Sequence, residues 1–219
     1  MKRVKNNGLL FFCSFFFLLY SCGLDTLVYL EPPHYTRHAD SEQEAEQYIG
    51  FRTSDTANAS TYCKGFQIFY KIYATLTDLQ TDVAAINSYN NSSPYAAARY
   101  LLETKKYKAV RGSNEPLILH TAADRVVKVR LYDYSVPPDP NAEKAGLYLD
   151  SSKDSDVFRY NGAAFKKLSN TAEDDDIYKT SKTAADYEYV AFFAVTVGLD
   201  EHFSPLYSQL LDLGHLVLK

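Results

Sequence analysis

Two long stretches in which side chains alternate constrain this chain most, because each predicts a β-strand with two distinct faces. The first stretch, 65–73, has apolar residues at every second position, namely Phe66, Ile68, Tyr70 and Ile72. Its intervening positions are mixed in character and hold Gln67, Phe69, Lys71 and Tyr73. In the second stretch, 187–197, one face is formed by Tyr187, Tyr189, Ala191, Phe193, Val195 and Val197. A period of two is typical of strands in a β-sandwich layer.

Shorter strands are expected elsewhere in the chain, at 48–53, 125–134, 146–149, 157–160 and 214–218. The composition favours the same class of structure, since the chain has 19 Tyr and 13 Phe but no Trp. Aromatic residues pack well on a half-buried pleated surface. We therefore predict a mainly β protein.

One segment has a helical period. Apolar residues recur there at steps of three and four, at Leu76, Leu79, Val83 and Ile86. Thr77 and Gln80 have the spacing of a capping box at its start. A second helix is predicted to begin at Ser93-Pro94, since proline is well tolerated at the first helical position. The two form a helical pair inserted at about 77–103.

The N-terminus has the pattern of a secretory signal. Three basic residues (Lys2, Arg3 and Lys5) precede an apolar run over 8–20, which is short for a membrane span. The next residues are Leu19-Tyr20-Ser21-Cys22-Gly23. This sequence resembles the lipobox of bacterial lipoproteins, although Tyr20 departs from the usual small or β-branched residue. The resemblance implies a lipid on the Cys22 thiol and cleavage after Ser21.

These features divide the chain into a signal peptide at 1–21, a flexible tether at 22–47 and a folded domain at 48–219. Pro32 and Pro33 disfavour a helix in the tether, and a flexible 25-residue linker spans about 25–30 Å. The alternative to the lipobox is an uncleaved anchor helix, because residues 6–24 carry no charge. Gly23 stands where some lipoproteins carry an Asp that retains them in the inner membrane, which favours the outer membrane.

The three cysteines are accounted for by this interpretation. Cys13 leaves with the signal and Cys22 carries the lipid, so Cys63 has no partner for an internal disulfide. Cys63 is therefore interpreted as a small packing residue.

The last third of the chain resembles a fibronectin type III or related immunoglobulin-like domain. A tyrosine, Tyr187 or Tyr189, opens an alternating strand, and a turn at Gly198-Leu199-Asp200 leads through 204–208 to a last strand. In that family the tyrosine forms a tyrosine corner. The resemblance implies an immunoglobulin or fibronectin type III-like β-sandwich. This chain departs from the family because it lacks a core Trp and exceeds the usual length of about 100 residues.

Three sets of polar residues have the composition of a metal site. His34 and His38 are four apart, a spacing that could hold a metal on a helix, but they follow two prolines in the tether. Two acidic sets lack the alternation and the glycine of a calcium loop; they are the run 173–176 (Glu173 to Asp176) and the trio Asp150, Asp154 and Asp156. We predict no metal site and no cofactor.

No motif for a serine nucleophile, a zinc protease or a phosphate-binding loop occurs, so no catalytic residue is predicted. Four tyrosines near loops could stack on a sugar or a protein, although packing on a sheet face is the favoured interpretation: Tyr132, Tyr134, Tyr148 and Tyr207.

Removal of the signal leaves 20 basic and 27 acidic residues, a net charge of −7. This acidity argues against a nucleic-acid partner. The first hypothesis is a non-enzymatic envelope lipoprotein whose loops at 135–145 and 169–186 contact a protein or glycan. The rivals are an envelope hydrolase with paired carboxylates and a subunit of an envelope assembly, which an apolar outer face on helix 94–103 would support.

Overall fold

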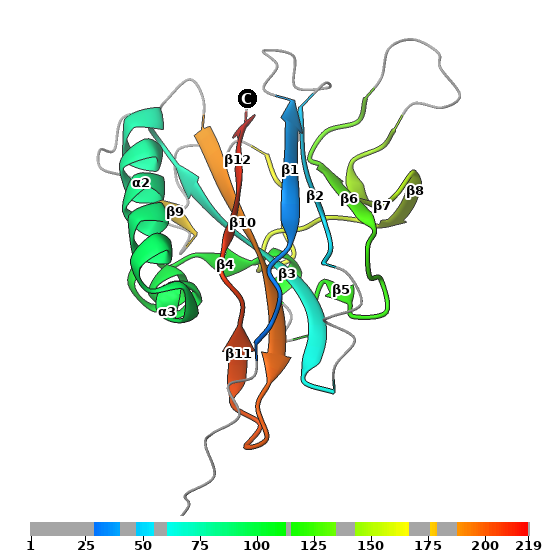
Figure 1. The fold of residues 1–219 in the computed structure, drawn as a ribbon. Coiled ribbons are helices and arrows are strands. Elements are labelled where there is room, and N and C mark those ends of the chain that lie inside the picture. The colour runs from blue at the N-terminus through cyan, green and yellow to red at the C-terminus, as the bar shows by residue number, and fades with distance from the viewer. Residues whose placement is uncertain are drawn as a thin grey trace, which may run out of the picture.

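The computed structural model of the chain describes residues 29–39, 47–54, 61–112, 115–134, 143–166, 176–178 and 188–218. Two β-sheets and a pair of helices make up these residues (Figure 1). The strands, in chain order, are β1 (His34–Ala39), β2 (Tyr48–Arg52), β3 (Cys63–Tyr73), β4 (Lys108–Ala109), β5 (Ile118–Leu119), β6 (Val126–Arg130), β7 (Gly146–Leu149), β8 (Ser152–Ser155), β9 (Ile177–Tyr178), β10 (Glu188–Leu199), β11 (Pro205–Tyr207) and β12 (Leu211–Leu218). The helices are α2 (Leu76–Ser92) and α3 (Pro94–Arg99), which continues as a π-helical turn over Tyr100–Thr104.

The first sheet has the order β1-β2-β6-β7-β8, with every neighbouring pair antiparallel. The second sheet is built around the long antiparallel pair of β3 and β10. Strands β12 and β11 pair with the outer edge of β10. The opposite edge of β3 pairs with β4, β5 and β9, of which only β9 is parallel. The chain is therefore mainly β, as its alternating pattern predicts.

The main core lies between the two sheets. The inner residues of β3 are those predicted to share one face, since Phe66, Ile68, Tyr70 and Ile72 all belong to this core. They pack with the inward side chains of the first sheet, among them Ile49, Phe51, Val127 and Val129. Beside this core, the backbone N–H of Val217 on β12 donates to the Gln47 side-chain oxygen just before β2, at 2.9 Å.

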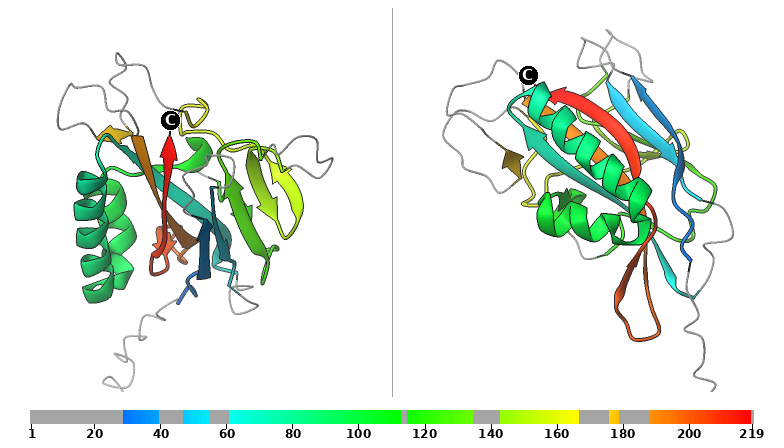
Figure 2. Two further views of the ribbon diagram at one scale, coloured as in Figure 1. Left: turned by 90° about the horizontal axis from the view of Figure 1, so that it is seen from above. Right: turned by 60° about the vertical axis from the view of Figure 1, so that its left-hand side comes forward.

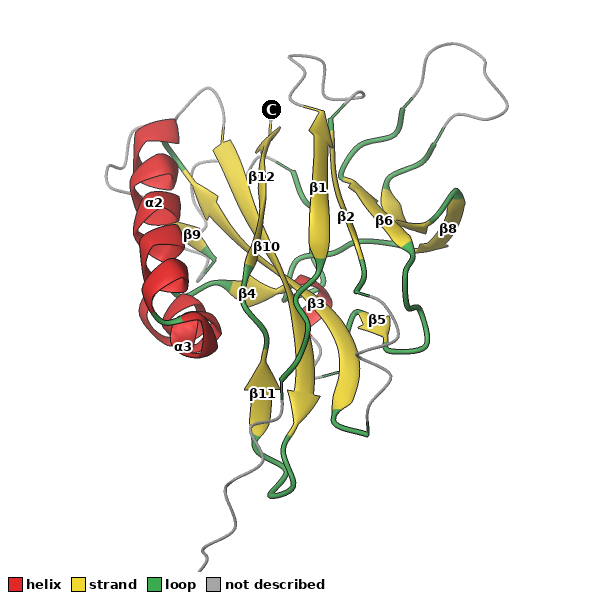
Figure 3. Ribbon diagram, in the orientation of Figure 1, coloured by secondary structure: helices red, strands yellow, loops and turns green. Residues whose placement is uncertain are grey.

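A second core lies between the second sheet and the helices, so the protein has three layers (Figures 2 and 3). It contains Phe69 and Tyr73 from β3, Ala191, Phe193 and Val195 from β10, and Leu79, Ile86 and Leu101 from the helical segment. The mixed face of β3 is therefore buried as well as its apolar face, with its residues at most 7% exposed. The sequence predicts one apolar face and one mixed face for this strand, and the helical pair covers the mixed face.

The helical pair is confirmed, but its start differs from the predicted capping box. Thr75, rather than Thr77, caps α2, and its side-chain oxygen accepts from the Asp78 backbone N–H at 3.1 Å. Asn90 fixes the far end of α2 to the residue just before β12 through two hydrogen bonds with Leu210: its amide donates to the Leu210 carbonyl and its side-chain oxygen accepts from the Leu210 N–H. Pro94 opens α3 as expected.

The strands predicted at 48–53, 65–73, 125–134, 146–149, 187–197 and 214–218 are confirmed within a few residues at their ends. The strand predicted at 157–160 is wrong, because this segment turns and sends Arg159 into the core. Its place at the sheet edge is taken by β8, at Ser152–Ser155.

The prediction of a flexible tether is wrong for part of 22–47. Residues His34–Ala39 form β1 and pair with β2. Leu30 and Pro33 are buried just before it. The two prolines are compatible with a strand because they precede its first residue, where no ladder hydrogen bond is lost. The stretch between Cys22 and the first described residue, Tyr29, is therefore only six residues long.

Candidate functional site

The outer face of the first sheet gathers tyrosines and cations around one carboxylate. Glu143 bridges two neighbours on β6, accepting hydrogen bonds from the Lys128 ammonium and the Arg130 guanidinium. Partial burial opposes ionisation of Glu143, but these two hydrogen bonds outweigh it and hold the pKa of the carboxyl below its ordinary value. The carboxylate is thus a fixed negative charge between two positive ones.

Aromatic rings enclose the two cations. The Arg130 guanidinium lies 5.3 Å from the Tyr48 ring centre and 5.2 Å from that of Tyr134. The Lys128 ammonium lies 5.6 Å from the Tyr48 ring centre and 5.8 Å from that of Tyr148. These distances are in the range of cation–π attraction. The rings and cations therefore form one packed layer on the sheet.

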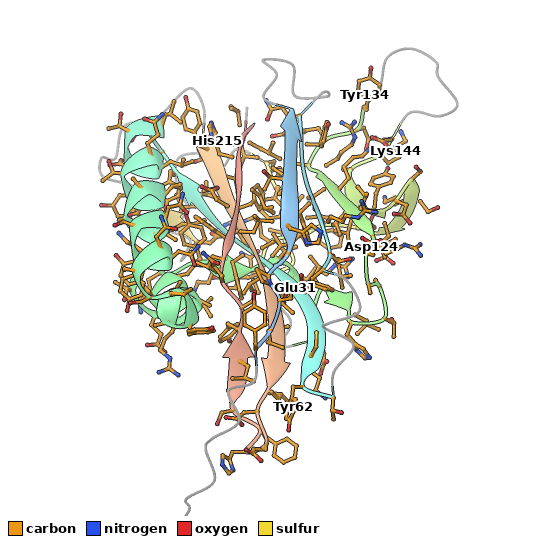
Figure 4. The ribbon with its side chains drawn as sticks, viewed as in Figure 1. Glu31, Tyr62, Asp124, Tyr134, Lys144 and His215 are labelled. Carbon is orange, nitrogen blue, oxygen red and sulfur yellow. The ribbon has the colours of Figure 1, made fainter. Side chains whose placement is uncertain are left out.

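This layer continues into the two ends of the 135–142 segment. The Tyr134 N–H donates to the Glu143 carbonyl at 2.7 Å. The Asp133 carboxylate accepts from the Ala145 N–H at 2.8 Å and from the Lys144 ammonium at 3.1 Å. These two groups hold the pKa of Asp133 below its ordinary value. We call Asp133, Tyr134, Glu143, Lys144 and Ala145 the loop root; Figure 4 shows Tyr134 and Lys144 at the end of the molecule opposite Tyr62.

A substitution at the centre of this layer should loosen the loop root. We expect Glu143→Gln to lower the free energy of unfolding by about 1–2 kcal/mol, because two charge-assisted hydrogen bonds are lost. Hydrogen exchange of the Tyr134 and Ala145 amides should accelerate. Glu103→Gln is the control, since Glu103 forms a more exposed pair with Arg99 at 3.7 Å and should change neither quantity. Unchanged exchange in Glu143→Gln would mean that the carboxylate does not hold the loop root.

A second ionic cluster lies where α2 covers β3. The Asp82 carboxylate accepts from the Lys105 ammonium at 2.8 Å, the Tyr73 hydroxyl at 2.9 Å and the Lys71 ammonium at 3.2 Å. Lys71 also donates to the Lys105 carbonyl at 2.8 Å. We call Lys71, Tyr73, Asp82, Lys105 and Tyr107 the seam cluster.

The surroundings set the protonation of the seam cluster. Desolvation lowers the pKa of Lys71 even though Asp82 opposes the shift. Burial raises the pKa of Tyr73 and Tyr107 far above the ordinary value, so both hydroxyls stay protonated. For Asp82, hydrogen bonds from Lys105 and Tyr73 outweigh burial, and its pKa is lowered. The Lys71 nitrogen is held by two oxygens and lies 4.8 Å from the Tyr178 ring centre, an arrangement that suits packing better than nucleophilic attack.

A third ionic group, the pair of Arg159 and Asp176, lies inside the main core. Arg159 is 1% exposed and Asp176 is fully buried. The guanidinium binds the carboxylate in a bidentate manner, with Nε donating to Oδ2 at 2.8 Å. The Tyr70 hydroxyl also donates to Oδ2, at 2.6 Å, and accepts from the Tyr160 N–H at 2.8 Å. Burial and this carboxylate raise the pKa of Tyr70 well above its ordinary value.

Three of the acidic residues considered as metal ligands are bound in ion pairs. Asp176 belongs to the buried pair with Arg159, while Glu173 to Asp175 lie outside the described residues. Asp150 pairs with Arg125 at 2.6 Å, and Asp156 pairs with Lys153 at 2.6 Å. Within the described part of the chain, no group of three His, Cys, Asp or Glu side chains could hold a metal ion.

The two histidines considered as ligands lie on β1, not on a helix. Four residues along a strand cover about 13 Å, so His34 and His38 do not have the helical spacing that a shared metal would need. Cys63 is buried, and burial raises the pKa of its thiol, as expected of a packing residue.

The four tyrosines named from the sequence pack against the protein. Tyr148 is 5% exposed, and its hydroxyl donates to the Lys144 carbonyl at 2.7 Å. Tyr134 lies beside Arg130. Tyr132 packs on the main core, and Tyr207 packs on the second core, between the second sheet and the helices. Tyr187 lies outside the described residues, and Tyr189 packs its ring 6.2 Å from that of His215.

Sequence reasoning missed the seam cluster, the Arg159–Asp176 pair and the role of Glu143. Lys71, placed on the mixed face of its strand, was the available signal for the seam cluster. The outer surface of α3 exposes Tyr95, but also the ion pair of Arg99 and Glu103, so it is not an apolar face.

Cys22 and most of the loops at 135–145 and 169–186 lie outside the described residues. No described helix is both long and apolar enough to cross a membrane. Comparison with family models, curated proteins and solved structures found no match.

Proposed function

We propose that this protein is a lipid-anchored lipoprotein of a bacterial envelope that displays a non-enzymatic binding or structural domain. The observation that carries the proposal is the lipobox-like sequence ending at Cys22, placed seven positions before Tyr29, where the described domain begins. Several acyl chains on one residue hold a protein firmly, since each buried methylene contributes about 0.8 kcal/mol. The outer membrane is the proposed site, on the basis of Gly23.

The two ends of the domain support a display role. Residues 29–31 run beside β10, where the Thr196 hydroxyl donates to the Glu31 carbonyl. The loop root lies at the other end of the molecule, as Tyr134 and Tyr62 illustrate in Figure 4. A domain tethered through Tyr29 would therefore direct the loop root away from the membrane, toward a protein or glycan partner.

The proposed fold is an immunoglobulin or fibronectin type III-like sandwich. The order of the strands supports this fold. In the first sheet, β1-β2-β6 corresponds to strands A, B and E of an immunoglobulin domain, and in the second sheet β12-β10-β3 corresponds to its strands G, F and C. The chain departs from that family in two respects. Strand β7 follows β6 in sequence but takes the place of strand D, and the helical pair covers the outer face of the second sheet.

The state of three described carboxylates supports a non-enzymatic role. A glycosidase acid needs a raised pKa. Asp82, Asp133 and Glu143 instead have lowered pKa values, because each is held by hydrogen bonds to cations or backbone. Their arrangement suits stabilisation of a scaffold.

Replacement of Cys22 tests the anchor. We expect wild-type protein to incorporate a palmitate analogue, to lose residues 1–21 and to fractionate with membranes, because only the Cys22 thiol accepts the lipid. Cys22→Ala should lose the label completely and should keep residues 1–21, because cleavage follows lipidation of Cys22. Intact mass and metabolic labelling, with and without the signal-peptidase inhibitor globomycin, measure these outcomes.

Cys63→Ala is the matched control, since it also removes one thiol but lies inside the fold. It should be labelled like the wild type. A wild-type protein that begins at Met1 and carries no lipid would contradict the proposal and would require residues 6–24 to act as an uncleaved anchor helix.

A further inference from the structure

The hairpin of β10 and β11 projects from one end of the molecule (Figures 1 and 2). At its tip, Phe203 leaves 81% of its surface exposed, the largest exposed fraction among the bulky apolar side chains of the described residues. Its neighbours His202, Ser204 and Pro205 are exposed as well. Contact with water disfavours a phenyl ring, so its position at a tip calls for a physical reason.

The backbone of the tip holds Phe203 in this position. The Asp200 carboxylate accepts from the His202 N–H at 2.8 Å and the Ser204 N–H at 2.7 Å. The Phe203 N–H donates to the Asp200 carbonyl at 3.0 Å. Phe203 has φ of 61°, a left-handed conformation that is uncommon for a bulky residue. The ring is therefore presented by an ordered turn.

The chain enters the domain beside this hairpin. Leu30 is buried, and its Cδ1 atom lies 3.0 Å from the position that a Cβ atom on Gly198 would occupy. Tyr29, the preceding residue, is 62% exposed. Tyr62 belongs to the same end, where its carbonyl accepts from the Leu199 N–H at 3.0 Å. The exposed Tyr29 thus lies where the chain leaves the described domain, and the hairpin that carries Phe203 extends from Gly198 at the same end.

Few residues separate this point from Cys22 in the sequence. Tyr29 follows Cys22 by seven positions (29 − 22), which span at most about 25 Å when fully extended and typically about 15 Å in a flexible chain. The typical span of about 15 Å is well below the roughly 25–30 Å expected for a flexible linker of 25 residues. If Cys22 carries lipid, the β10–β11 end is held close to the bilayer surface.

We propose that the β10–β11 tip is a membrane-contacting loop, which places Phe203 in the interfacial region of the bilayer that holds the Cys22 lipid. This inference rests on the lipid anchor proposed above. Aromatic side chains favour the membrane interface. The phenyl ring makes this contact, and electrostatic attraction does not contribute to it. Because the tip carries Asp200 and Glu201 and the mature chain is acidic, anionic lipid is not required. Two attachment points fix the orientation of the domain.

The absence of tryptophan from the chain provides a specific probe. In lipidated mature protein reconstituted into phosphatidylcholine vesicles, we expect Phe203→Trp to show blue-shifted emission that lipids brominated near the headgroup quench. Tyr95→Trp is the control, because Tyr95 is 66% exposed on α3. It should show neither effect. Addition of phosphatidylglycerol should leave both results unchanged.

Flotation with the vesicles tests the lipid anchor on Cys22 separately from the membrane contact of Phe203. Suppose that the Phe203→Trp protein floats, but its indole emission in the vesicles matches that of the same variant made as unlipidated residues 22–219 with Cys22→Ala and measured in buffer. This result would overturn the membrane contact and leave the anchor intact. Wild-type protein that does not float would overturn both. A blue shift in buffer that grows with protein concentration would assign the tip to a second copy of the chain and would also overturn the inference.

Discussion

Arg159→Met should lower the free energy of unfolding by about 3–5 kcal/mol, because it leaves the buried Asp176 carboxylate without its cation. Arg159 is 1% exposed and Asp176 is fully buried, so water cannot replace the lost partner. The Tyr70 hydroxyl would still donate to the carboxylate, but one neutral hydrogen bond does not compensate for a buried charge. Urea denaturation followed by circular dichroism measures the change.

Arg125→Met is the matched control, since Arg125 also pairs with an aspartate, Asp150, at 2.6 Å. Both side chains of that pair are about half exposed, and its loss should change stability by no more than about 1 kcal/mol. The double variant Arg159→Met/Asp176→Leu should recover part of the loss, because no unpaired charge stays in the core. Equal effects of Arg159→Met and Arg125→Met would refute the energetic role assigned to the buried pair.

Asp82→Asn should lower the free energy of unfolding by about 2–3 kcal/mol, less than at Arg159 because the seam cluster is partly open to solvent. The substitution keeps the size of the side chain but leaves the Lys71 and Lys105 ammonium groups without their shared carboxylate. The double variant Asp82→Asn/Lys71→Met should regain stability, since it removes the more buried cation. A thermal or urea denaturation series across the three variants tests this order.

The same carboxylate gives a pH dependence with a defined sign. The folded-state pKa of Asp82 lies below its ordinary value of 3.8. Its stabilising contribution is therefore complete above pH 3.8 and is lost as pH falls through the folded-state pKa. Asp82→Asn should lose less stability than the wild type on acidification through this window. Parallel acid denaturation curves for the two proteins would contradict the assignment.

The long strands could be predicted because their signal is local. The alternation in 65–73 needs only neighbouring residues to be recognised, and β3 and β10 follow it closely. Strands β4, β5 and β9 have two residues each, too few to show a period. They exist because the edge of β3 offers partners that lie far away in the sequence.

The polar clusters could not be predicted for a related reason. Asp176 belongs to a run of acidic residues that resembles a solvated loop, and only the fold brings Arg159 and Tyr70 to it. Lys71 on a mixed strand face gave a partial signal, but its partner Asp82 becomes evident only once α2 lies over the sheet. β1 was missed because the prolines before it indicated a tether.

The pairing of β3 with β10 also determines when this chain can fold. Paired residues are 116 positions apart at Tyr73 and Tyr189, and 135 apart at Cys63 and Gly198. Such a pair forms only after a long loop has closed, which makes folding slow. Until β10 has been synthesised, β3 has an unpaired edge and apolar side chains on both faces. The nascent protein therefore stays without its central sheet until its last fifth is made, and β3 is the segment that needs protection from aggregation in the meantime.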